Sequence, residues 1–180
     1  MTVLVQGVLG AVGTLAGQLA RWGGATVIGT VRRHVDVPGE AVLAADHIIA
    51  VDGTDPAAEI RALSAGGVDR IVEVAFSDNA DLDAAVTKVG TVIAAYATRH
   101  DRPTIPFWPL LFDNVTIRLL GSDDFPPEAK QQAAGDLSTA AASGALAVPI
   151  GEPHPLSGIA AAHDRVDTDN RQRVLIDVDG

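Results

Sequence analysis

Short apolar stretches alternate with amphipathic stretches over the first 120 residues. Runs rich in Val, Ile and Ala are typical of strands that a parallel sheet buries on both faces, and the intervening segments repeat their apolar positions with helical spacing. The pattern predicts strands at residues 3–6, 26–30, 47–50, 70–74, 91–96 and 114–120, and helices at residues 14–22, 38–43, 55–63 and 79–88. Asp55 or Thr54 is expected to cap the third helix, and a long loop is expected at 97–113.

This order of elements predicts an α/β fold of the Rossmann type. Helices would cover both faces of a doubly wound parallel sheet, with strand order 3-2-1-4-5-6. After Gly121 the pattern changes. An Ala-rich helix is expected at 126–143, then a strand at 146–150, a helix at 156–164 and a final strand at 173–178.

Glycines cluster between the first strand and the first helix, in the segment GVLGAVG at 7–13. Small residues there form the phosphate-binding entry of a dinucleotide fold, because the backbone must approach a pyrophosphate closely. We expect Gly10 to adopt dihedrals closed to other residues and to leave room for phosphate oxygens, and Gly13 to let the helix lie close to the strand. The helix would then direct N–H groups and its positive dipole end at the anion.

The spacing of these glycines departs from the usual motif. Gly7, Gly10 and Gly13 give G-x-x-G-x-x-G in place of G-x-G-x-x-G. The alternative is an ordinary strand-to-helix turn that binds nothing. On the dinucleotide interpretation, residues 1–122 form the cofactor-binding domain and residues 123–180 form a C-terminal extension.

The charge balance limits the partners. A net charge of −10 argues against nucleic acid and anionic membrane surfaces. No apolar run is long enough to span a bilayer, and the apolar start belongs to the first strand and glycine turn, so we expect no signal peptide and a cytoplasmic protein. The chain has no Cys, which excludes disulfides and thiolate metal sites, and its five His residues show no metal-ligand spacing, so no metal site is expected.

The cofactor preference depends on the end of the second strand. An NAD site usually has an acidic residue about 20 residues beyond the glycines, which binds the ribose 2′-hydroxyl. Thr30 occupies that place, Arg32 and Arg33 follow, and no acid appears before Asp36. A guanidinium can bond two oxygens of a 2′-phosphate, so the sequence predicts NADPH. The alternative is that these arginines are solvated loop charges.

The whole chain resembles the C-terminal part of a medium-chain dehydrogenase/reductase, in the zinc-independent quinone reductase branch that includes zeta-crystallin and the enoyl reductases. The segments that carry the resemblance are VLVQGVLGAVGTLAGQLARWGGATVIGT, AADHIIAVDG, GVDRIVEVAF, GTVIAAYA, LLFDNVTIRLLG, HPLSGIAAAHDRV and RVLIDV. Members of this family carry an N-terminal GroES-like domain that holds much of the substrate pocket. Its absence implies an expressed fragment or a naturally shortened protein, whose C-terminal extension would in the family pack partly on that domain.

The resemblance implies further cofactor contacts at the ends of the strands. Backbone N–H groups of Ala11 and Val12 would reach the pyrophosphate. Val51 and Asp52 would border the adenine, and Ala75 and Phe76 the ribose. Tyr96 and Ala97 would lie near the nicotinamide, and Gly121 and Ser122 would bond its carboxamide. Phe76 and Tyr96 have a plain packing role as their alternative.

Hydride transfer needs little from a protein beyond orientation and a proton source. Tyr96 is the only tyrosine and is the candidate proton donor, with Asp123, Asp124 and His154 as further candidates. The chain has neither a G-x-S-x-G nucleophile elbow nor a Walker A motif. The loop PTIPFWPLLF at 103–112 either walls a pocket for an apolar or aromatic substrate or packs over the last strand.

Three functional hypotheses follow. The chain is an NADPH-dependent reductase of small apolar or aromatic quinones, enones or enoyl thioesters, or a cofactor-binding module that needs a partner domain, or a shortened enzyme with non-redox chemistry in a biosynthetic pathway. The strand at 114–120 is β-branched and apolar, and it should form an exposed edge of the sheet. In the resembled family this edge pairs with its twin, so a homodimer through 114–120 is expected.

Overall fold

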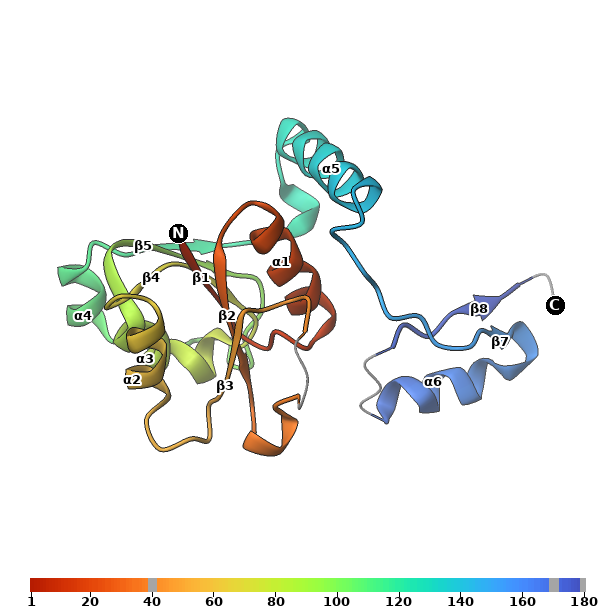
Figure 1. Ribbon diagram of the computed structural model, residues 1–180, viewed down its shortest axis with the longest axis horizontal. Coiled ribbons are helices and arrows are strands. Elements are labelled where there is room, and N and C mark those ends of the chain that lie inside the picture. Colours follow the sequence, from red (N-terminus) through yellow and green to blue (C-terminus); the bar gives the residue numbers. More distant parts are fainter. Residues whose placement is uncertain (39–41, 169–171, 179–180) are drawn as a thin grey trace.

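The computed structural model describes residues 1–38, 42–168 and 172–178. Six parallel strands form one sheet in the order β3-β2-β1-β4-β5-β6, so the predicted fold and strand order are confirmed (Figure 1). The strands are β1 (Thr2–Val5), β2 (Thr26–Val31), β3 (His47–Ala50), β4 (Val68–Glu73), β5 (Thr87–Ala95) and β6 (Thr116–Leu119). The order reverses between β1 and β4, and ligands of such sheets bind in the crevice outside the carboxyl ends at that point.

Helices lie on both faces of the sheet and continue into the C-terminal segment. They are α1 (Ala11–Trp22), α2 (Pro56–Leu63), α3 (Phe76–Val86), α4 (Phe107–Phe112), α5 (Pro127–Ala142) and α6 (Ile159–Asp167), with short 3₁₀ turns η1 (His34–Asp36), η2 (Ser122–Asp124) and η3 (Leu156–Gly158). Strands β7 (His154–Pro155) and β8 (Ile176–Asp177) pair outside the main sheet.

The sheet separates two hydrophobic cores. Leu4 of β1 lies in the core beneath α2 and α3, whereas its neighbours Val3 and Val5 lie in the core beneath α1. Successive side chains of a strand point to opposite faces, so one apolar run serves both layers. This accounts for the near-continuous apolar strands of the sequence.

The start of α2 follows the predicted signal. The Asp55 carboxylate accepts a hydrogen bond from the Ala58 N–H at 2.9 Å, and Pro56 occupies the first helical turn. An aspartate side chain at this place satisfies an N–H that has no partner inside the helix, and proline there loses no helical hydrogen bond.

Four predicted elements differ from the structure or fall partly outside its described residues. The expected loop 97–113 contains α4, because FWPLLF places proline within the first helical turn, where it is tolerated. The expected strand 146–150 is an extended segment with only a single bridge, Ile150 to Arg173, and the expected strand 173–178 shortens to β8. The helix expected at 38–43 falls largely on residues 39–41, which lie outside the described residues; residues 42–43 are not helical.

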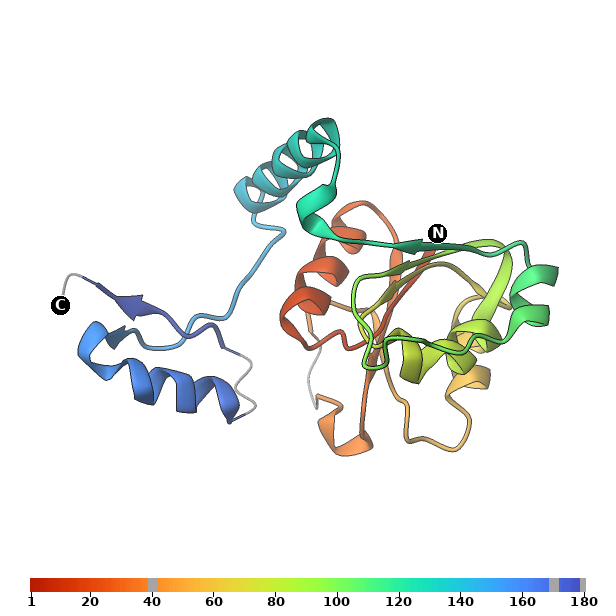
Figure 2. The ribbon, with the colours of Figure 1, turned by 180° about the vertical axis from the view of Figure 1, so that it is seen from behind.

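The C-terminal segment leaves the sheet after β6. Helix α5 contacts α1, and the unit of β7, α6 and β8 stands apart from the sheet on the α1 side (Figures 1 and 2). The amide of Gln18 in α1 donates to the Ala147 carbonyl at 3.0 Å and accepts from the Ala147 N–H at 2.6 Å. Among the described residues, every helix is too short or too polar to cross a membrane.

Candidate cofactor site

The glycine turn between β1 and α1 is shaped by hydrogen bonds that its N–H groups donate to the neighbouring strand β2. The Gly7 N–H donates to the Thr30 hydroxyl at 3.2 Å, and the Val8 N–H donates to the Thr30 carbonyl at 3.1 Å. The Gly10 N–H closes the turn on the Gly7 carbonyl at 2.9 Å. Gly7 has φ +66°, a left-handed conformation that favours glycine.

The close approach predicted for Gly13 is confirmed. A Cβ atom built on Gly13 would lie 2.3 Å from the Gly7 carbonyl oxygen, so only glycine lets α1 approach the turn this closely. The prediction for the dihedrals of Gly10 is wrong. Gly10 has φ −75° and ψ 172°, which any residue adopts, because the sharp turn is made at Gly7 instead.

The N-terminus of α1 presents backbone donors above this turn. The helix begins at Ala11, its cap residue Gly10 has no side chain, and its first turn contains no acidic residue. The first N–H groups of a helix have no carbonyl partner within it and sit at the positive end of the helix dipole. Ala11 and Val12 are exposed there, so their backbone can meet an anion.

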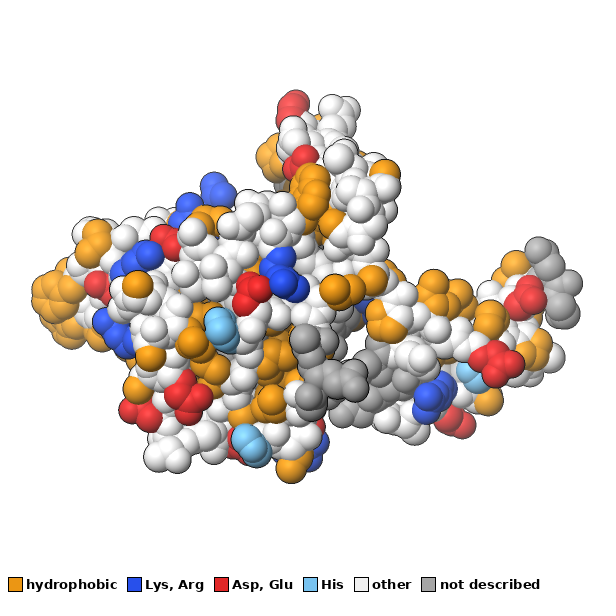
Figure 3. All heavy atoms as spheres, viewed as in Figure 1, with side chains coloured by type: hydrophobic (Ala, Val, Ile, Leu, Met, Phe, Trp, Pro, Cys, Tyr) orange, Lys and Arg blue, Asp and Glu red, His pale blue; other side chains and the backbone are white. Residues whose placement is uncertain are grey.

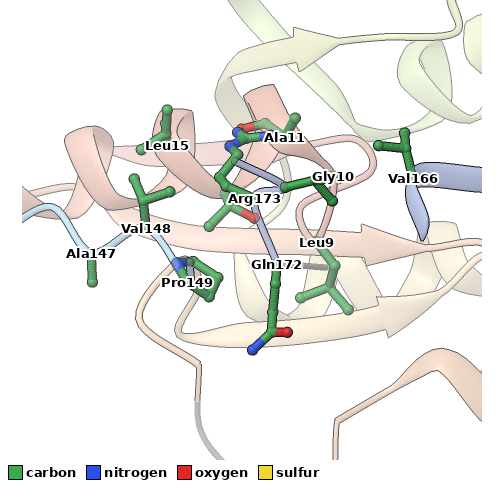
Figure 4. Close-up of a pocket in the computed structure, with 12 residues that line it drawn as sticks. Leu9, Gly10, Ala11, Leu15, Ala147, Val148, Pro149, Val166, Gln172 and Arg173 are labelled. Atoms are coloured by element: carbon green, nitrogen blue, oxygen red, sulfur yellow. The ribbon is translucent and has the colours of Figure 1, made fainter. Parts of the chain in front are cut away.

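A cavity of about 430 Å³ lies between this helix terminus and the C-terminal segment. Leu9, Gly10 and Ala11 line one side, and Val148, Val166 and Arg173 are among the residues that line the other (Figure 4). The Arg173 guanidinium donates to the Ala11 carbonyl at 3.1 Å across a separation of 162 residues. Arg173 is not among the residues predicted from the sequence, because nothing in its local sequence connects it with the glycine turn.

Two buried carboxyl groups lie at the switch point of the sheet. Glu73 ends β4, Asp83 lies on α3, and both are fully buried. Asp83 accepts a hydrogen bond from the Gln6 amide at 2.8 Å, and Glu73 accepts from the Asn79 amide at 3.1 Å and from the Ala75 N–H. The sequence gives little sign of them, because a lone acid in a helix usually faces solvent.

Burial shifts these groups toward their neutral forms. The pKa of Asp83 is raised well above its usual value by loss of hydration and by the charge of Glu73, and burial also raises the pKa of Glu73. Burial and the same Glu73 charge raise the pKa of the half-buried Tyr96 phenol. Tyr96 therefore keeps its proton at neutral pH.

At the end of β2, the Thr30 side chain faces the interior, and the two arginines that follow lie at the surface. The Thr30 side chain is buried and donates to the side-chain oxygen Oε1 of Gln6 at 2.5 Å, so it faces inward rather than toward a ribose. Arg33 forms an ion pair with Asp36 at 3.0 Å, whereas Arg32 is exposed. Asp52 accepts from the His34 N–H at 2.8 Å, which fixes the turn after β2 beside the end of β3.

The other candidates follow the strand ends as expected, with one exception. Phe76 is buried in the core beneath α2 and α3, which agrees with its packing alternative. Three of these residues are half-buried, namely Val51, Ala75 and Tyr96. Three others are exposed, namely Ala97, Gly121 and Ser122. These residues lie at or just after the carboxyl ends of β3, β4, β5 and β6, along one edge of the sheet.

The weaker candidates lie elsewhere. Asp123 and Asp124 belong to η2, where the Lys130 ammonium donates to the Asp123 carbonyl at 2.8 Å. His154 belongs to β7, outside the six-stranded sheet. Within residues 1–38, 42–168 and 172–178, no three His, Cys, Asp or Glu side chains are grouped to hold a metal ion.

A family model described as zinc-binding dehydrogenase matches residues 11–134. The chain belongs to this family. The match begins at the first residue of α1 and extends through the sheet into α5. A comparison with curated proteins found no match.

Solved structures share the fold. A quinone oxidoreductase from Pseudomonas syringae is 21% identical, with a TM-score of 0.79 over 97% of this chain. The quinone oxidoreductase from Thermus thermophilus, solved also with NADPH, is 21% identical with a TM-score of 0.78 over 98%. CurA from Vibrio vulnificus, in complex with NADPH, is 18% identical with a TM-score of 0.73 over 99%. The chain spans only 56%, 57% and 57% of these three proteins.

Proposed function

We propose that this chain is the cofactor-binding part of an NADPH-dependent oxidoreductase of the quinone, enone or enoyl reductase type. The observation that carries the proposal is the glycine turn, where Gly13 lies against the Gly7 carbonyl and the N-terminus of α1 faces a cavity. This is the geometry that a pyrophosphate requires. The NADPH complexes of structural neighbours support the choice of cofactor.

The pyrophosphate end fits this chain's own residues. Ala11 and Val12 would donate their backbone N–H groups, and Arg173 would place a positive charge over the same terminus, where it already contacts Ala11. At the ribose end, Arg32 is exposed and the place of the usual acid is taken by buried Thr30. Arg32 is therefore our first choice for the 2′-phosphate, with Arg33 second because Asp36 pairs with it.

The nicotinamide would lie beside the carboxyl ends of β5 and β6. Gly121 and Ser122 would bond its carboxamide, and Val51, Asp52 and Ala75 would border the adenine and ribose. NADPH supplies the hydride when bound. Tyr96 holds a proton at its phenol oxygen and is our candidate donor to the reduced substrate.

A second candidate function is favoured by the length of the match. The chain spans about half of its structural neighbours, so the substrate can require residues from another domain or another chain. On this alternative the chain binds cofactor but turns over only with a partner, or performs non-redox chemistry.

We also propose that the protein is a homodimer through β6. This strand is the edge of the sheet, and Leu119 on it is 77% exposed. The preceding helix α4 adds the exposed rings of Phe107, Trp108 and Phe112. Apolar side chains gather at the left of Figure 3, where Figure 1 places α4. Light scattering should give twice the chain mass, and Thr116→Pro should reduce it to one chain. A monomeric wild type contradicts this interface.

Calorimetric titration with NADPH and NADH tests the main proposal. The loss of a charge-assisted hydrogen bond to phosphate is worth about 1.5–3 kcal/mol, so NADPH should bind about ten- to a hundredfold more tightly than NADH. Equal or tighter NADH binding contradicts the NADPH preference, and no binding of either contradicts the proposal. NADPH oxidation with a simple quinone then separates an active reductase from a module that needs a partner.

A further inference from the structure

A chain of buried polar side chains runs beneath the glycine turn. The Gly7 N–H donates to the Thr30 hydroxyl at 3.2 Å, and that hydroxyl donates to the side-chain oxygen Oε1 of Gln6 at 2.5 Å. The side-chain Nε2 of Gln6 in turn donates to Oδ1 of Asp83 at 2.8 Å. Gln6, Thr30, Glu73 and Asp83 are at most 2% exposed. Buried polar groups are costly unless each is hydrogen-bonded, so the far end of this chain needs an explanation.

The far end is Oδ2 of Asp83. Among the described residues this buried oxygen has no hydrogen-bond donor. It belongs to a carboxyl in contact with Glu73, and Glu73 itself accepts from Ala75 and from Asn79. Two ionised carboxylates would therefore repel each other with one buried oxygen unpaired, whereas one proton on Oδ2, donated to Glu73, satisfies both groups.

We propose that Glu73 and Asp83 share one proton, and that this proton makes them positioning residues for the cofactor-binding turn. The inference rests on the proposed function, because it assigns the cofactor to that turn. With the proton present, every hydrogen bond from Gly7 to Glu73 points in one direction and each acceptor has its donor. Without it, the two carboxylates repel each other, and displacement of Asp83 shifts the Gln6 amide hydrogen-bonded to it, the Thr30 hydroxyl next in the chain, and with that hydroxyl the acceptor of the Gly7 N–H.

The surroundings of the pair offer no competing charge. The facing side chains from β1, β2 and α3 are Gln6, Thr30 and Asn79, none of which titrates. Tyr96, at the end of β5, is the titratable group that the Glu73 charge reaches. No Lys, Arg or His of the described residues forms an ion pair with either carboxyl. Loss of the shared proton therefore leaves two buried negative charges.

The test is the dissociation constant of NADPH as a function of pH, from about pH 7, where the 2′-phosphate is already ionised, across the pH at which the side-chain carbon-13 signal of Asp83 titrates. If the turn binds only with the proton in place, the dissociation constant rises about tenfold for each pH unit above the titration of the pair. Asp83→Asn keeps a donor toward Glu73 and an acceptor for Gln6 without a titrating proton. Its dissociation constant should stay within about threefold of the wild-type value near pH 7 and should not change with pH.

Asp81→Asn is the matched control, since it removes the same charge from an exposed position on the same helix. It should follow the wild-type pH profile. A wild-type dissociation constant that is constant over this range overturns the proposal, as does an Asp83→Asn protein whose profile equals that of the wild type.

A second measurement separates this proposal from the proposed function. The backbone amide signal of Gly7 in nitrogen-15 NMR of the wild type should move with the titration of the pair, and it should not move in Asp83→Asn. If it does so while neither NADPH nor NADH binds, the hydrogen-bonded chain stands and only the assignment of the cofactor fails. A Gly7 signal that is insensitive to pH in the wild type overturns the positioning role, whether or not the variant folds.

Discussion

Residues 1–120 and residues 122–178 bury their apolar side chains to very different extents. In the first region, Leu4, Ile28 and Ile71 are fully buried in a core that spans several strands and helices. In the described part of the second, the buried apolar residues are two alanines, Ala140 and Ala162. Larger apolar side chains of this region are exposed to solvent, and Figure 3 shows apolar side chains on the surface of the C-terminal unit.

The difference indicates which part stabilises the other. Strands of two residues cannot bury enough apolar surface to fold alone, so the C-terminal unit depends on its attachment to the sheet domain. The C-terminal segment is attached to α1 by the contact of α5 and by hydrogen bonds between Gln18 and Ala147 and between Arg173 and Ala11. The sheet domain therefore carries the stability, and the C-terminal segment contributes one wall of the candidate cofactor site.

A truncation in each region measures this difference most directly. Ile71→Ala empties part of the main core and should lower the free energy of unfolding by about 2–5 kcal/mol. Ile159→Ala, at a residue that is 46% exposed on α6, should change it by less than about 0.5 kcal/mol. Urea unfolding followed by circular dichroism gives both values. Similar losses for the two variants would show that the C-terminal unit has a core of its own.

Alanine substitutions of two arginines test whether the C-terminal segment contributes to cofactor binding. Arg173→Ala should weaken NADPH binding by about 1.5–3 kcal/mol, or about ten- to a hundredfold, because it removes the charge beside Ala11. The control is Arg165→Ala, an exposed arginine on α6 that does not line this cavity. Calorimetric titration measures both. Equal affinity in the two variants would remove Arg173 from the site.

A glycine pair tests how tightly each region is packed. Gly13→Ala places a Cβ 2.3 Å from the Gly7 carbonyl oxygen, and such overpacking should cost about 1–3 kcal/mol of unfolding free energy. Gly135→Ala, in α5, meets no atom within 4 Å and should stabilise that helix by up to about 1 kcal/mol. Thermal unfolding should show a lower stability for Gly13→Ala and a higher stability for Gly135→Ala. An unchanged stability of Gly13→Ala would mean that α1 moves away from the turn at little cost.

The sequence predicted best where burial supports the pattern. The strand at 47–50 has the predicted bounds, because its apolar run ends at residues that leave the sheet. Residues 146–150 are as apolar as a strand, yet they lie outside the sheet with one bridge, so composition alone misled the prediction. Helix α4 lies within the predicted loop 97–113, because Pro109 stands in its first turn, where proline is tolerated.

The candidate site was predicted only in part, for physical reasons. The close approach of Gly13 is a local property of the turn, and the glycine spacing reveals it. The left-handed residue is Gly7 rather than Gly10, because hydrogen bonds that Gly7 and Val8 donate to Thr30 set the turn, and these depend on the neighbouring strand. The pair of Glu73 and Asp83 and the contact of Arg173 arise from tertiary packing, which no local pattern records.

The smallest expected effect concerns an ion pair at the rim of the sheet. The Lys88 ammonium lies 2.9 Å from the Asp69 carboxylate, whose second oxygen accepts from the Thr2 N–H at 2.7 Å. The hydrogen bond from Lys88, and then that from Thr2, lower the pKa of Asp69. A carboxyl with a lowered folded-state pKa adds stability that is fully present above its unfolded value of about 4 and is lost as the pH falls through the folded-state value.

Lys88→Met should therefore lower the free energy of unfolding near neutral pH by about 0.2–1 kcal/mol, as expected for a partly exposed pair, and by less below about pH 3. Lys130→Met is the control in the C-terminal region, because its ammonium meets only the backbone carbonyl of exposed Asp123. Its effect should lie near zero at both pH values, since Lys130 forms no ion pair among the described residues. Urea unfolding at two pH values compares the variants. A loss for Lys88→Met that is the same at both would mean that the lysine stem, and not its charge, supports Asp69.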